Sequence, residues 1–96
     1  MSPTHYPIAN PVVVLREEFD DWAVLFNPDT AEAVGINPVG VTVWKLMDGS
    51  RVVADLTAGV QAQFSAVPDG VEEEVRKFVM DLARRGFVGY KVEETA

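Results

Sequence analysis

Few side chains in this 96-residue sequence are suited to catalysis or to metal binding. There is no cysteine, which excludes thiolate nucleophiles, disulfides, iron–sulfur clusters and cysteine-ligated zinc. The single histidine, His5, lies in a proline-punctuated N-terminal segment, and no HExxH motif or histidine cluster accompanies it. We therefore expect no catalytic residue, and an incidental role for His5.

Two acidic runs, at residues 17–21 and 72–74, are the remaining candidates for cation binding. Neither has the ligand spacing of an EF-hand loop, and a solvated turn and a helix N-terminus explain them without a metal. The glycines are scattered, and neither GxxxxGK[ST] nor GxGxxG occurs, so no phosphate-binding loop is predicted. No metal and no cofactor are expected, and the function that the sequence supports is binding rather than catalysis.

The charge balance narrows the class of partner. Eight basic and fifteen acidic side chains give a formal net charge of −7. Nucleic-acid binding and docking on anionic membranes both need clustered lysine and arginine, so neither partner is expected. The sequence also lacks a signal peptide and an apolar run long enough to span a membrane, which makes a cytoplasmic protein the default expectation.

Short apolar segments separated by turn residues fill the first part of the chain. They are rich in β-branched and aromatic residues, which is typical of strands, and the turns between them are short. This order predicts a three-stranded antiparallel meander whose first and third strands form the edges. We expect Trp22, and Trp44 in the helical part, to be buried core anchors. The expected strands are residues 12–18, 22–26 and 32–36.

The apolar residues change to helical spacing after residue 36. Asn37 is expected to cap the first helix with Pro38 at its first position, and Gly86 is expected to end the third. The fold class is therefore α+β, a three-stranded antiparallel sheet followed by three helices. The chain divides into a flexible N-terminus (1–9), a single domain (10–92) and an acidic tail (93–96).

Four runs, in this order and spacing, resemble the PqqD family, the peptide-recognition domains (RiPP recognition elements) of ribosomal peptide modification pathways. They are NPVVVLREE at 10–18, NPVG at 37–40, WKLMDG at 44–49 and LARRGFV at 82–88. The resemblance implies a winged helix-turn-helix-like fold. It also implies that the leader of a precursor peptide adds as a further strand on the third strand, beside the third helix, and is presented to a modifying enzyme, often a radical SAM maturase.

The third strand and the third helix carry the residues expected to bind this peptide. The strand has one charge and no proline, and the small Ala33 and Gly35 leave room for another backbone, as β-augmentation requires. Alternatively, Gly35 marks only a bulge. On the helix, Met80 lies among cations and either forms a floor for an acidic amphipathic peptide or is simply one exposed methionine. The expected site residues are Glu32, Ala33, Val34, Gly35, Ile36, Arg76, Phe78, Val79, Met80 and Ala83.

Three functional interpretations follow. The first is a non-catalytic module whose partners are a precursor leader peptide and a radical SAM maturase. A winged-helix nucleic-acid binder would share the topology, but the net charge of −7 opposes it. A structural adaptor that forms a homodimer through its edge strand is the third.

Overall fold

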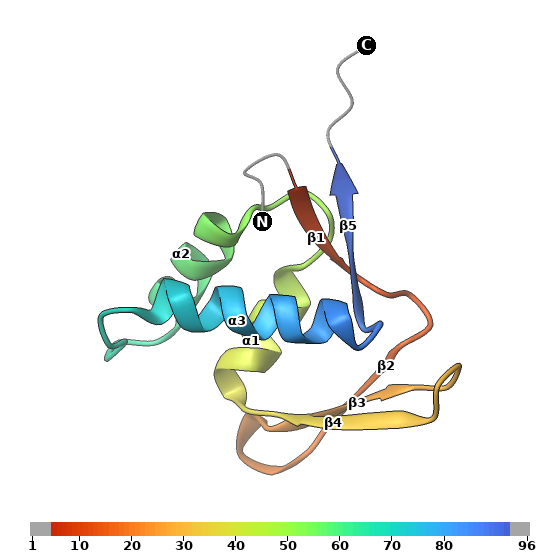
Figure 1. The fold of residues 1–96 in the computed structure, drawn as a ribbon. Helices are drawn as coiled ribbons and strands as arrows, with labels where there is room; N and C mark the ends of the chain where they lie inside the picture. Colours follow the sequence, from red (N-terminus) through yellow and green to blue (C-terminus); the bar gives the residue numbers. More distant parts are fainter. Residues whose placement is uncertain (1–4, 93–96) are drawn as a thin grey trace.

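A three-stranded antiparallel sheet lies on one side of three helices in the computed structural model, which describes residues 5–92 (Figure 1). Its strands are β2 (Val14–Glu17), β3 (Ala23–Asn27) and β4 (Glu32–Ile36), in the order β2-β3-β4. The antiparallel meander predicted from the sequence is therefore confirmed, with β2 and β4 at its edges.

The three predicted helices follow the sheet. They are α1 (Pro38–Leu46), α2 (Val53–Gln63) and α3 (Val71–Arg84). The Gly40 N–H donates to Oδ1 of Asn37 at 2.8 Å, which confirms Asn37 as the cap of α1. Glutamates occupy the first turn of α3 and Arg84 its last, as the helix dipole favours. Among residues 5–92, no helix has the length and apolar character needed to cross a bilayer.

Two further strands form a separate ribbon that joins the two ends of the chain. β1 (His5–Ala9) pairs antiparallel with β5 (Val88–Val92). The expectation of a flexible segment over residues 5–9 is therefore corrected. The prolines near the N-terminus indicated a flexible segment. The strand that pairs with β1 is β5, about eighty residues away, and no local sequence pattern can show such a pairing. Residues 1–4 and the predicted acidic tail at 93–96 lie outside the described residues.

The core lies between the inner face of the sheet and the helices. Leu25 and Ile36 from the sheet are buried with Trp44 from α1, which confirms Trp44 as a core anchor. Trp22 is not one, because 51% of its surface is exposed. Side chains alternate between the two faces of a strand, and since Ala23 faces the core, Trp22 must face outward.

Candidate functional site beside the third sheet strand

β4 pairs with β3 along one edge, and among the described residues no strand covers its other edge. Alternate N–H and C=O groups of such a strand point outward without a ladder partner. Gly35 pairs with Val24 in an unbroken register, so it is not a bulge. A Cβ built on Gly35 would meet nothing within 4 Å, which leaves this part of the sheet open to another chain.

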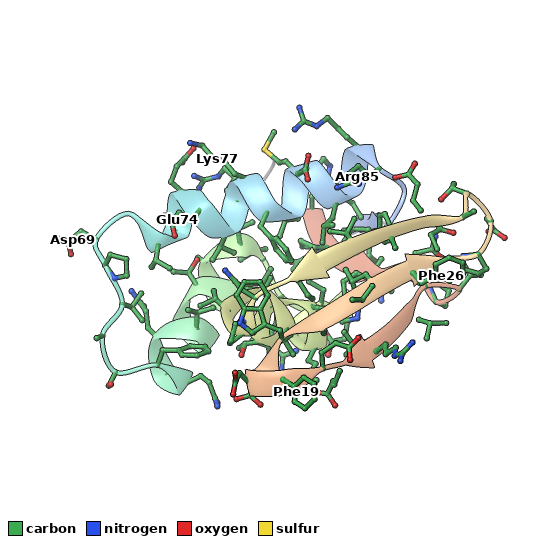
Figure 2. All side chains as sticks on the ribbon, turned by 90° about the horizontal axis from the view of Figure 1, so that it is seen from below. Phe19, Phe26, Asp69, Glu74, Lys77 and Arg85 are labelled. Atoms are coloured by element: carbon green, nitrogen blue, oxygen red, sulfur yellow. The ribbon has the colours of Figure 1, made fainter. Side chains whose placement is uncertain are left out.

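α3 runs beside β4 in the opposite direction (Figure 2). At one end, Nε of Arg85 lies 3.5 Å from Oε2 of Glu32, the first residue of β4. At the other end, the Phe78 ring packs against Gly40, where an added Cβ would lie 3.2 Å from the ring. We call this region, formed by β4 and the flank of α3 that faces it, the β4–α3 site.

An apolar cavity of about 240 Å³ opens where β4 ends and α1 begins. It lies between α1, the end of α2, the α2–α3 connection and the first half of α3, and it is large enough for one bulky apolar side chain. The polar groups at its wall are Asn37, whose side chain caps α1, and Glu74. Apolar residues supply the rest of the wall, among them Val39, Val43, Phe64, Val67, Val75 and Phe78.

The charges of the β4–α3 site are mainly negative. The Arg85 guanidinium is shared between Glu32 and Asp81, with 3.5 and 3.8 Å between the charged atoms. Glu74 has no ion-pair partner among the residues described. Three carboxylates against one guanidinium therefore favour an incoming segment that is apolar and basic rather than acidic. This preference differs from the acidic peptide on a basic helix face that was expected from the sequence.

The structure places four of the five expected α3 residues away from β4. At about 100° per residue, Arg76, Met80 and Ala83 lie on the opposite flank from Phe78. Arg76 is held there by Glu73, with 2.7 Å between the charged atoms. Val79 is completely buried in the core. Phe78 alone among the five lies on the side of α3 that faces β4.

Two contributors to the site were missed from the sequence. Arg85 has no local sequence pattern that indicates this role, because its partner Glu32 is more than fifty positions away. Gly40 offered a usable pattern, since an isolated glycine inside a helix costs about 1 kcal/mol relative to alanine and therefore calls for an explanation. Here the reason is the Phe78 ring, which a side chain at position 40 would displace.

Comparison with known proteins links this geometry to a family. The family model for PqqD, described as coenzyme PQQ synthesis protein D, matches residues 23–88, from β3 to the start of β5. The solved structure of TbiB1 in complex with the TbiA(beta) leader peptide superposes with a TM-score of 0.68 at 25% sequence identity. The alignment covers 93% of this chain and 98% of that one. No curated protein matches the sequence.

Proposed function

This chain belongs to the PqqD family, and we propose that it binds the leader segment of a ribosomally made precursor peptide and presents it to a modifying enzyme. In this role the protein is a non-catalytic accessory. The observation that carries the proposal is the open edge of β4, with an apolar cavity at its end. The similar structure of TbiB1, solved with a leader peptide, supports this use of the fold.

The peptide binds by β-augmentation. An extended segment pairs with the outward backbone groups of Glu32–Ile36, and these hydrogen bonds are largely independent of the peptide's sequence. Selectivity comes from the end of the β4–α3 site where the cavity opens. One apolar side chain enters the cavity beside Phe78, and a basic residue is favoured near Glu74.

The enzyme that receives the peptide is, on this proposal, a radical SAM maturase, and both proteins act in the cytoplasm. Family resemblance supports the choice of enzyme class. Pairing of two copies through β4 is disfavoured, because each copy carries a net charge of −7.

The arginines of α3 do not support the winged-helix DNA-binding alternative. Arg76 and Arg84 are engaged by carboxylates on the same helix, at 2.7 and 3.5 Å. Duplex DNA at about 50 mM salt, where phosphate contacts are strongest, should therefore show no micromolar binding.

The test is a titration of the full chain with fluorescently labelled synthetic peptides. They correspond to the N-terminal halves of short open reading frames encoded beside this gene, and scrambled peptides of the same composition are the controls. We expect saturable binding with a micromolar or lower Kd for one natural peptide, and none for its scrambled form. Equal binding of both forms, or no saturable binding by any neighbouring peptide, would overturn the proposal.

A further inference from the structure

The outer face of the β2–β3–β4 sheet is apolar except for Arg16, and no described residue covers it. The strand register places Val14, Phe26 and Ala33 side by side on this face, with Arg16, Val24 and Gly35 in the next row. Val14 is 55% exposed and Phe26 is 41% exposed. An antiparallel sheet with one solvated face usually has polar residues there, so this pattern requires an explanation.

A turn and the residue after it, Trp22, add two exposed aromatic side chains next to this face. The turn is η1 (Phe19–Asp21), in which Phe19 is 90% exposed. It is closed by the Trp22 N–H donating to the Phe19 carbonyl at 3.1 Å and the Glu18 N–H donating to the Trp22 carbonyl at 2.7 Å.

The backbone of this turn is strained. Asp20 and Asp21 have φ angles of 57° and 65°, in a region that non-glycine residues rarely adopt. Strain of this kind persists where the surrounding structure enforces it, and it gathers at functional positions. Here the enforced conformation displays Phe19 rather than burying it. We call Val14, Phe19, Trp22, Val24 and Phe26 the outer apolar face; Figure 2 looks onto it, with Phe19 and Phe26 labelled.

The charges around this face select the kind of partner. Glu18 comes directly before η1, which contains Asp20 and Asp21, and the turn between β3 and β4 contains Asp29. Arg16 is the one cation among the described residues of the outer sheet face, and its Nε lies 3.8 Å from Oε1 of Glu18. Two copies of this chain would bring these carboxylates together, whereas a protein with a lysine- or arginine-rich rim would complement them.

We propose that the outer apolar face is the docking surface for the enzyme that acts on the bound peptide. That enzyme would offer an apolar recess, filled by Trp22 and Phe19, within a basic rim. The inference rests on the proposed function, because a peptide added to β4 would extend this same sheet next to Ala33 and Gly35. A partner seated here would touch the protein and the peptide at once.

The experiment places the photo-cross-linker p-benzoylphenylalanine at position 19, in the full chain, in cells that produce this protein. The matched control carries it at Gln61, an exposed residue of α2. We expect a cross-link from position 19, and not from position 61, to an enzyme of peptide modification, at a site flanked by lysine or arginine. A cross-link only to a second copy, equal cross-links from both positions, or none from position 19 would overturn the inference.

Affinity measurements with the cross-linked enzyme, once purified, complete the test. Trp22→Ser and Phe26→Ser should each raise the Kd for the enzyme at least tenfold, and thermal melts establish that the variants fold. Asp20→Asn with Asp21→Asn should weaken enzyme binding about threefold, because asparagine tolerates positive φ while removing the charge. Unchanged affinity in all these variants would overturn the inference.

Peptide titrations on the same variants separate this inference from the proposed function. The peptide Kd should stay within twofold, because β4 is unaltered. If no peptide binds the parent protein, the proposed function fails whatever the cross-linking shows. If peptides bind and position 19 reaches no enzyme, only the docking surface fails.

Discussion

The two edges of the β2–β3–β4 sheet are built differently. At the β2 edge, Arg16 and Glu17 are charged, and Glu17 is held by Lys45 of α1 at 2.7 Å. At the β4 edge, Glu32 is the only charge and the residues after it are small or apolar. Charged side chains are a common device against unwanted strand pairing. β2 has this protection and β4 lacks it, which indicates that β4 is the edge kept for a ligand.

Proline substitutions give the largest expected contrast between the edges. Val34 and Gly35 are adjacent, so one N–H points toward β3 and the other outward. Proline at the outward position should leave the fold intact and raise the peptide Kd about 30-fold, or about 2 kcal/mol, through a lost hydrogen bond and a clash with the incoming chain. Proline at the inward position should destabilise the domain. Calorimetric titration and thermal melts measure both effects.

The matched controls are Leu15→Pro and Arg16→Pro on β2. Each of these two variants that folds should bind the peptide with a Kd within twofold of that of the parent. If proline variants at Val34 and Gly35 fold and bind the peptide with the Kd of the parent, the two edges do not differ in function.

Two neighbouring residues of α3 separate binding from stability. Phe78→Ala should raise the peptide Kd about tenfold, because it removes the aromatic wall of the cavity. Val79→Ala should instead lower the free energy of unfolding by about 2 kcal/mol, since Val79 is buried in the core. Denaturant unfolding and titration should give opposite rankings of the two variants. The same ranking from both measurements would contradict the assigned orientation of α3.

Charge selection by the β4–α3 site predicts a smaller effect. Glu74→Gln should weaken binding of a peptide that carries lysine next to its apolar anchor by up to about fivefold, and the loss should shrink at high salt. Glu73→Gln is the matched control, because Glu73 pairs with Arg76 on the other flank. Competition fluorescence anisotropy at two salt concentrations measures the peptide Kd of the Glu74→Gln and Glu73→Gln variants. An equal effect of both substitutions would mean that only the overall charge matters.

The smallest effect is expected at Asp48, in the turn after α1 and away from both edges. Hydrogen bonds from Ser50, together with the nearby charge of Arg51, lower the pKa of Asp48 below its ordinary value of 3.8. A lowered pKa stabilises the fold above about pH 3.8, and this contribution is lost as the pH falls through the folded-state pKa. The stability difference between the parent and Asp48→Asn should therefore shrink in that acidic range. A pH series of thermal melts tests this, and a constant difference would contradict it.

The parts predicted correctly from the sequence depend on local chemistry. The bounds of β4 follow from turn residues on both sides, and Asn37 and Pro38 begin α1 as their backbone preferences require. The orientation of α3 could not be read in the same way. Its apolar stripe predicts which side faces the core, but the Arg85–Glu32 and Phe78–Gly40 contacts decide which flank meets β4.

Trp22 shows a second limit of the sequence. Its strand is apolar on both faces, which predicts burial on both, but the described residues cover only one face of the sheet. The β1–β5 ribbon shows a third, because its pairing joins opposite ends of the chain.

Hydrogen exchange of the β4 amides, read by NMR with and without the cognate peptide, tests the central claim most directly. In the free protein, alternate amides of residues 32–36 should exchange rapidly, because no strand within residues 5–92 covers the outer edge of β4. With the peptide bound, these outward amides alone should become protected, while the amides of β2 keep their free-state rates. Uniform protection of the whole domain, or changes confined to α3, would contradict strand addition at β4.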